Sequence, residues 1–129
     1  MRTPFHVGID IVSVRRMREA IERQGARFLN RVFTKSEQTY CNRKRTKYES
    51  YAARFAAKEA VIKAKKGGRG RYAFRDIEVV SGLRGAPSIY VSPKARMKLG
   101  LSSGAKFELT LAHERDFAVA AVVLFDGGG

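Results

Sequence analysis

Apolar residues are spaced differently in the two halves of the chain, with helical spacing first and alternation later. Residues 5–12 form a short run rich in branched side chains, which predicts a strand. Ser13 can cap a helix that follows directly, and Gly25 ends or kinks it. The apolar stripe expected on this helix consists of Val14, Met17, Ala20 and Ile21.

Two more helices are predicted in the middle of the chain. The sequence Thr34-Lys35-Ser36-Glu37 is a capping-box pattern, which opens a helix that ends near Asn42. Residues 43–47 form a basic connector. Residues 48–65 contain good helix formers throughout and predict the longest helix, with Gly67-Gly68 as its stop signal.

The second half of the chain predicts mainly strands. We expect strands at residues 76–80 and 88–91, with a short helix over residues 93–99 that starts at Ser92-Pro93. Residues 106–113 and 116–125 predict an antiparallel hairpin with a tight turn. Because helices gather early and strands late around one initial strand, the expected fold class is α+β, an antiparallel sheet packed with helices.

Length and composition predict a single domain. The chain has 129 residues, and 44% of them are hydrophobic, which is enough for a core. We expect one domain over residues 1–126 and a glycine tail over residues 127–129. No run of about 18 apolar residues indicates a membrane span, and no signal sequence is apparent. The single cysteine, Cys41, excludes an internal disulfide framework, so the sequence favours a cytoplasmic protein.

Charge gives the first indication of function. The formal net charge is +14, and residues 15–71 contain 18 basic and 5 acidic residues, a net of +13. Such a surface favours a polyanionic partner: a nucleic acid, an anionic membrane, an acidic protein or a phosphate-rich small molecule. Charge alone does not choose among these partners.

Two carboxylates interrupt apolar patterns. Asp10 lies in the middle of the first predicted strand, and Glu59 lies on a stripe of the long helix that should be buried. That stripe consists of Tyr48, Ala52, Phe55, Glu59 and Ile62. Each acid could simply pair with a cation, as Glu59 could with Lys63 one turn later. Two such carboxylates without histidines also suit Mg²⁺, which prefers oxygen ligands and keeps water and substrate phosphates in its shell.

Further residues could hold phosphate. The long helix contains Arg54, Lys58 and Lys63, and the glycine-rich segment 67–71 follows it, where bare backbone lets a phosphate approach closely. A glycine helix stop with solvated lysines explains the same pattern. His113 ends a predicted strand on its apolar row, where it is either structural or a phosphate donor.

Three segments, in this order, resemble one known family. They are Gly8-Ile9-Asp10-Ile11-Val12 with Arg16 following, Arg54-Phe55-Ala56-Ala57-Lys58-Glu59-Ala60 with Lys63, and Leu109-Thr110-Leu111-Ala112-His113-Glu114. With Phe33-Thr34 and Glu37 between the first two, they are similar to the holo-acyl-carrier-protein synthases, the small bacterial 4'-phosphopantetheinyl transferases. The resemblance extends from Val7 to about Phe125. The chain departs from it at Ser13, where an acid is common, and at Ala112, where Ser or Thr is usual.

The resemblance implies an activity and a set of partners. The fold would be a compact α+β domain that assembles as a homotrimer with sites at the subunit interfaces. The reaction would move 4'-phosphopantetheine from coenzyme A to a serine of apo-acyl carrier protein, for fatty acid biosynthesis. Mg²⁺ would be the cofactor and adenosine 3',5'-bisphosphate the second product. Neither nucleic acid nor membrane is expected as a partner.

The resemblance also implies roles for single residues. Asp10 and Glu59 would be the Mg²⁺ ligands, and Lys63 would act with them at the pyrophosphate and the reacting centre. Arg16, possibly joined by Arg23, would hold the acidic carrier protein. The residues expected around coenzyme A are Arg45, Arg54, Lys58, Lys63, Gly67, Gly68 and His113.

Elementary chemistry agrees with this implied activity, although two alternatives stay open. Coenzyme A contains a pyrophosphate and a 3'-phosphate, and acyl carrier proteins are acidic, so one basic stretch can serve both. A nucleic-acid-binding module would use the same charge, but it leaves the two acids on apolar faces unexplained and needs stacking aromatics between the cations. A non-catalytic trimer would require that Asp10 and Glu59 be mere ion-pair partners.

Overall fold

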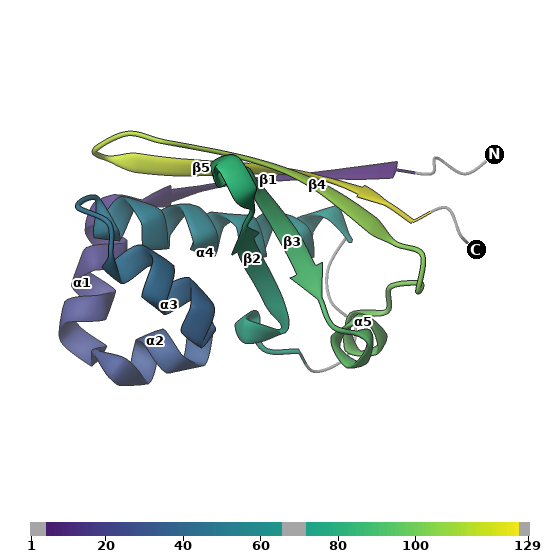
Figure 1. Cartoon of the computed structure of the whole chain (residues 1–129), viewed down its shortest axis with the longest axis horizontal. Coiled ribbons are helices and arrows are strands. Elements are labelled where there is room, and N and C mark those ends of the chain that lie inside the picture. Colours follow the sequence, from purple (N-terminus) through teal and green to yellow (C-terminus); the bar gives the residue numbers. More distant parts are fainter. Residues whose placement is uncertain (1–4, 66–71, 127–129) are drawn as a thin grey trace.

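The computed structural model describes residues 5–65 and 72–126, and their elements form two antiparallel sheets and a set of helices (Figure 1). The larger sheet has the strand order β1–β5–β4, and the smaller one pairs β2 with β3. The strands are β1 (Phe5–Ser13), β2 (Ile77–Ser81), β3 (Pro87–Val91), β4 (Lys106–His113) and β5 (Phe117–Phe125). The helices are α1 (Val14–Gln24), α2 (Ala26–Val32), α3 (Lys35–Asn42), α4 (Lys47–Ala64) and α5 (Pro93–Leu99), with 3-10 turns at Phe74–Asp76 and Leu83–Gly85. The predicted α+β class is confirmed.

The predicted helix starts are confirmed where a side chain caps the helix. The hydroxyl of Ser13 accepts from the backbone N–H of Arg16, and Thr34 and Glu37 form the expected capping box. Helix α2 was not predicted. Gly25 turns the chain at φ 58°, and α2 resumes at the next residue without a capping side chain, so no sequence signal marks its start.

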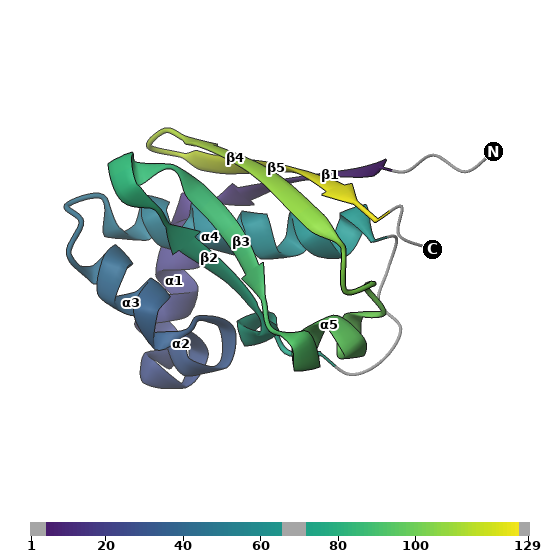
Figure 2. The ribbon, with the colours of Figure 1, turned by 45° about the vertical axis from the view of Figure 1, so that its right-hand side comes forward.

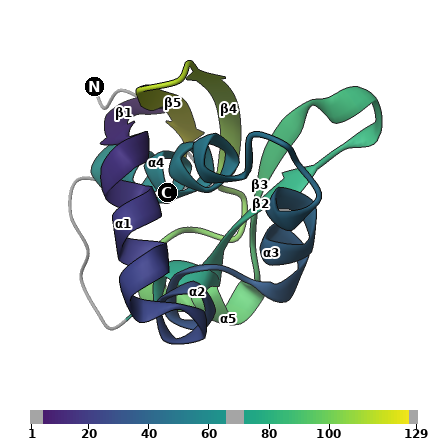
Figure 3. The ribbon, with the colours of Figure 1, turned by 90° about the vertical axis from the view of Figure 1, so that its left-hand side faces the viewer.

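Helix α4 runs along the inner face of the larger sheet, with α1 and α3 on its two flanks (Figures 1 and 3). Its contact surface with the sheet is made of alanines, which let a strand approach closely; Ala56, Ala57, Ala60 and Ala64 are fully buried. The closest approach is at Gly8 of β1, where an added Cβ would lie 1.9 Å from the carbonyl oxygen of Ala60. The backbones of β1 and α4 therefore touch directly.

The expected stripe of α4 is only partly right. Ala52 is buried, but Tyr48, Phe55, Glu59 and Ile62 are half-buried. The deeper face of α4 is the alanine-rich one that meets the sheet, and the stripe lies at its margin, beside α1. Glu59 consequently borders the core rather than entering it.

On the larger sheet, the outer face of β1 and β5 is apolar and is not covered by any described element of the chain (Figures 1 and 2). In β1 the side chains alternate, so that Gly8 and Asp10 point toward α4 and Val7, Ile9 and Ile11 point outward. Val7, Ile9 and Ile11 expose 64%, 60% and 62% of their surface. Such a row of exposed apolar side chains is unusual for a monomeric protein.

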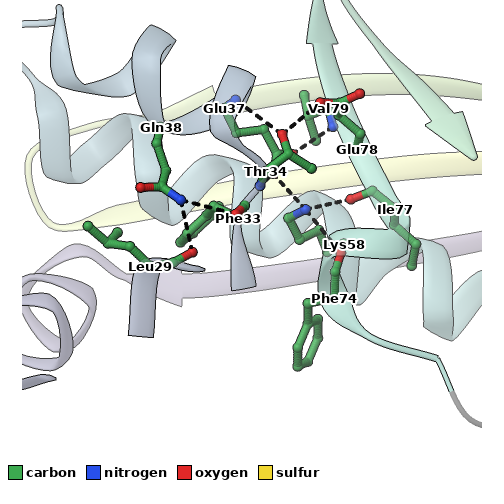
Figure 4. A network of polar contacts seen from close by, with 10 residues as sticks. All are labelled: Leu29, Phe33, Thr34, Glu37, Gln38, Lys58, Phe74, Ile77, Glu78 and Val79. Atoms are coloured by element: carbon green, nitrogen blue, oxygen red, sulfur yellow. Dashed lines mark hydrogen bonds and ion pairs between the residues drawn. The ribbon is translucent and has the colours of Figure 1, made fainter. Parts of the chain in front are cut away.

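A buried ion pair joins α3 to α4 (Figure 4). Lys58 and Glu37 are both fully buried, with Nζ 2.9 Å from Oε1. The same carboxylate accepts from the backbone N–H groups of Thr34 and Val79, both at 2.8 Å, and the Lys58 ammonium also donates to carbonyl oxygens of Phe74 and Ile77. Burial lowers the pKa of Lys58, and the negative charge of Glu37 opposes that shift.

We expect Lys58→Met to lower the free energy of unfolding by about 3–5 kcal/mol, because Glu37 would stay buried without its cation. Arg15→Ala, which breaks the exposed pair with Glu19, is the control and should cost less than about 0.5 kcal/mol. Urea denaturation of both variants measures the difference. A cost below about 1 kcal/mol for Lys58→Met would contradict the structural role given to this pair.

Candidate active site

Asp10 and Glu59 meet at one cavity. The tight contact at Gly8 fixes β1 against α4, so Asp10, two residues later on the same row, lies beside the Glu59 face of the helix. Together with α1 and α2 they enclose a space of about 410 Å³. We call it the carboxylate cavity; its lining is Asp10, Ile11, Val12, Ser13, Arg16, Met17, Ala20, Phe28, Phe55 and Glu59.

Lys63 is bound to Asp10 and not to Glu59. Its ammonium lies 2.8 Å from Oδ1 of Asp10 and donates to the carbonyl oxygen of Ile9 at 3.2 Å. The hydrogen bond to Asp10 raises the pKa of Lys63. Burial, and then the negative charge of Asp10, raise the pKa of Glu59, while Lys63 lowers it. The carboxylates of Asp10 and Glu59 thus face one cavity, and Lys63 forms an ion pair with Asp10 alone.

The carboxylate cavity fits a divalent cation with hard-ligand preference. A cation between the two acids would offset the burial of Glu59 and the negative charge of Asp10, which together raise the pKa of Glu59. Among the described residues, no group of three or more His, Cys, Asp or Glu side chains could hold a metal ion. A cation here would have two carboxylates as protein ligands and would need water and substrate for the rest, an arrangement that Mg²⁺ accepts.

A second cavity, the arginine cavity, lies on another side of α4. Its volume is about 260 Å³, and Arg54 and His113 both line it. The full lining is Tyr40, Ser50, Ala53, Arg54, Gly85, Pro87, Leu109, Thr110, Leu111 and His113. His113 is exposed at the end of β4. Arg54 and His113, both expected around coenzyme A, thus line the same cavity.

Arg54 is a buried cation without a counter-ion. Only 5% of its surface is exposed, and no ion pair links it to a carboxylate within the ranges 5–65 and 72–126. One Nη donates to the hydroxyl of Ser81 at 2.9 Å, and the guanidinium lies over the ring of Tyr40, 4.0 Å from its centroid. Its Nε is buried and, in the described part of the chain, has no hydrogen-bond partner. A buried guanidinium in this state favours an anionic ligand.

The two cavities open on different sides of α4. Glu59 faces α1 and Arg54 faces α3 and β4, which lie on opposite flanks of the helix (Figure 3). Among the described residues, none lines both cavities. The five-residue separation of Arg54 and Glu59 on the helix produces this divergence.

The structure corrects one predicted site residue and leaves others without a test. Lys58, expected among the coenzyme A ligands, is fully buried and holds Glu37, so that prediction is wrong. Arg45 is exposed in the loop between α3 and α4 and lines neither cavity. Gly67 and Gly68 lie outside the described residues.

Arg16 and Arg23 both lie on α1, where the carrier protein was expected to bind. Arg16 is exposed and lines the carboxylate cavity, while Arg23 is exposed in the last turn. Arg16 thus places a cation at the carboxylate cavity.

Sequence reasoning did not identify two residues that contact Arg54 at the arginine cavity. Tyr40 lies on α3 and Ser81 ends β2, and both contact Arg54 across long separations in the sequence. No periodicity or motif links these positions, so only the packing of α3, α4 and β2 reveals them.

The chain is similar to known proteins over most of its length. The family model described as the 4'-phosphopantetheinyl transferase superfamily matches residues 6–122. A holo-[acyl-carrier-protein] synthase from Chlamydia felis is 42% identical over 119 residues, covering 92% of this chain and 94% of its own length. One from Halothermothrix orenii is 43% identical over 122 residues, covering 94% and 97%.

Solved structures show the same fold. A Helicobacter pylori holo-[acyl-carrier-protein] synthase in complex with coenzyme A superposes with a TM-score of 0.79 at 33% identity, covering 92% of this chain and 98% of its own. A coenzyme A complex from Chronobacterium ammoniagenes gives a TM-score of 0.83 at 28% identity, covering 96% and 98%. Within the described residues, moreover, no helix has the length and apolar character that crossing a membrane demands. The chain belongs to the 4'-phosphopantetheinyl transferase superfamily, and within it to the holo-[acyl-carrier-protein] synthases.

Proposed function

We propose that the chain transfers 4'-phosphopantetheine from coenzyme A to a serine of apo-acyl carrier protein, releasing adenosine 3',5'-bisphosphate. The observation that carries this proposal is the pair of unlike cavities: two carboxylates suited to a cation and a pyrophosphate, and a buried, unpaired arginine suited to a separate phosphate. Coenzyme A has both groups. The proposal includes fatty acid biosynthesis as the context and the cytoplasm as the location, which the single buried thiol of Cys41 supports.

Each cavity would perform one part of the task. Asp10 and Glu59 would hold Mg²⁺, which when bound offsets negative charge on the pyrophosphate as its bond breaks. Lys63 already lies at Asp10 with an exposed ammonium, so it can bind pyrophosphate oxygens beside that site. Arg54 and His113 would bind the 3'-phosphate at the other end of the ligand.

Asp10→Ala and Glu59→Ala should each abolish transfer and leave the fold intact, because either change removes half of the metal's protein ligands. The mass of an apo-carrier protein after incubation with coenzyme A and Mg²⁺ measures transfer. Glu22→Ala, which removes an exposed acid of α1, is the control and should keep normal turnover. Near-normal turnover of either cavity variant at saturating Mg²⁺ would overturn the metal assignment.

The acidic carrier protein would bind along α1. The exposed face of this helix contains four arginines, Arg15, Arg16, Arg18 and Arg23, and Arg16 continues it to the carboxylate cavity. A basic helix next to the reacting centre would bring the serine of an acidic partner to the pyrophosphate. Charges at such a rim mainly set the rate of association and its salt dependence.

Arg16→Glu should raise the KM for carrier protein at least about tenfold more than the KM for coenzyme A, because it reverses a charge on the docking face. Lys94→Glu makes the same change on exposed α5 and serves as the control. Steady-state kinetics with each substrate varied in turn measures both constants. Equal effects on the two substrates would place Arg16 in the nucleotide site or in the fold instead.

We also propose that three copies of the chain assemble, with each active site shared by two neighbours. The uncovered apolar face of the larger sheet supports this, because burying Val7, Ile9 and Ile11 against other copies removes it from water. The placement of the cavities supports it too. Because the carboxylate and arginine cavities open on different sides of α4, one extended ligand is reached more easily by cavities from two adjacent copies.

Mixing Asp10→Ala with His113→Ala, each impaired alone, should restore part of the activity after subunits exchange. Some interfaces of a mixed trimer would then combine an intact carboxylate cavity with an intact arginine cavity. Transfer assays on the mixture, with exchange verified by native mass spectrometry, provide the measurement. No gain over the separate variants would overturn the shared site, and a monomer by light scattering would overturn the assembly itself.

A further inference from the structure

Arg54 is held by side chains from two other elements. Tyr40 of α3 stacks on the face of the guanidinium, and Ser81 at the end of β2 accepts a hydrogen bond from one Nη. Nε makes no hydrogen bond within the described part of the chain. These two neighbours, rather than a carboxylate, are therefore what fixes the plane of the guanidinium at the arginine cavity.

Tyr40 also lies next to a second cation. The Lys44 ammonium lies 4.8 Å from the centroid of its ring. Burial raises the pKa of Tyr40, but the neighbouring cations Arg54 and Lys44 and the polar side chain of Ser81 outweigh it, so the pKa lies below its ordinary value. Arg54 thus joins the Tyr40 ring and the Ser81 hydroxyl in one connected unit.

Core packing explains only part of this unit. Tyr40 packs at the edge of an apolar cluster, but it is only half-buried, and it also lines a third cavity of about 460 Å³ between α3 and β2, which Ser81 lines as well. A ring between two hollows contributes less to the hydrophobic core than one surrounded by apolar side chains. The same ring contacts the cations of Arg54 and Lys44.

Orientation matters for an arginine that binds phosphate. A guanidinium in a fixed plane can give two parallel hydrogen bonds to phosphate oxygens, whereas a mobile one acts only as a point charge. Stacking on an aromatic face restricts that plane without using any N–H donor, and the Ser81 hydroxyl uses one. The remaining donors stay available to a ligand.

We propose that Tyr40 and Ser81 are positioning residues for Arg54, and that through it they determine the preference of the enzyme for coenzyme A over its analogue without the 3'-phosphate. This inference rests on the proposed function. Because the 3'-phosphate is remote from the pyrophosphate that reacts, the unit contributes to substrate binding and not to the chemical step. Its removal therefore raises KM for coenzyme A and leaves kcat unchanged.

The test compares Tyr40→Leu, Tyr40→Phe and Ser81→Ala with Thr39→Ala, a neighbouring change on the exposed side of α3. In Tyr40→Leu we expect the kcat/KM ratio of coenzyme A to 3'-dephospho-coenzyme A to fall about tenfold, with kcat and the KM for the dephospho analogue unchanged. Tyr40→Phe keeps the ring and should lose at most about threefold, whereas Ser81→Ala removes the hydrogen bond to Arg54 and should lose about two- to threefold. Thr39→Ala should match the wild type.

Direct binding gives a readout that does not need turnover. Calorimetric titration with adenosine 3',5'-bisphosphate should show about tenfold weaker binding in Tyr40→Leu and normal binding in Thr39→Ala. If the wild type fails to catalyse transfer, the proposed function is wrong, and this titration series alone decides the present inference.

Three results would overturn the inference. The first is an unchanged kcat/KM ratio of coenzyme A to 3'-dephospho-coenzyme A in Tyr40→Leu. The second is an equal rise in KM for these two substrates, and the third is a fall in kcat with KM unchanged. Thermal melting checks that each variant is folded. If Tyr40→Leu does not fold, Tyr40→Phe and Ser81→Ala decide the question together, and wild-type ratios and wild-type bisphosphate affinity in both would overturn it.

Discussion

The direct contact between the backbones of β1 and α4 determines where the chemistry of this protein lies. Only a glycine fits at position 8, because the carbonyl oxygen of Ala60 occupies the space of a side chain. This contact fixes the distance between β1 and α4 and the position of the strand along the helix. Asp10 comes to lie beside Glu59, and Lys63 reaches the Asp10 carboxylate from the same helix. The outward row of β1 is then left for contacts with other molecules.

Helix α4 brings three charged groups into three different environments. Glu59 borders a cavity that another acid shares, and Lys58 is buried with a carboxylate that neutralises it. Arg54 is buried with no carboxylate partner among the residues that the structure describes. The three groups differ in what surrounds and neutralises their charges, and not only in their positions on the helix. The charge of Lys58 is satisfied within the fold, whereas the charges of Glu59 and Arg54 are satisfied best by something bound from outside.

Local signals in the sequence predicted much of this fold, and long-range packing accounts for the rest. Ser13 and Thr34 cap helices through their own side chains, so α1 and α3 could be placed from a few residues. Helix α2 starts without such a cap and was missed. Lys58 belongs to a motif that suggested ligand binding, but its burial depends on Glu37, which is far away in the sequence. The contact of Tyr40 and Ser81 with Arg54 depends likewise on three elements coming together.

The pairing of β1 with β5 has a consequence for how the protein is made. Asp10 lies opposite Ala120, so the strand that holds the first acid finds its hydrogen-bond partner only near the other end of the chain. Pairing over such a sequence separation forms slowly and requires closing a long loop. On the ribosome, helices α1 to α4 can form while β1 still lacks its neighbour. The sheet that contains Asp10 is therefore completed only once β5 has been synthesised and docked, and a chain interrupted before β5 contains both Asp10 and Glu59 but leaves β1 without its strand partner.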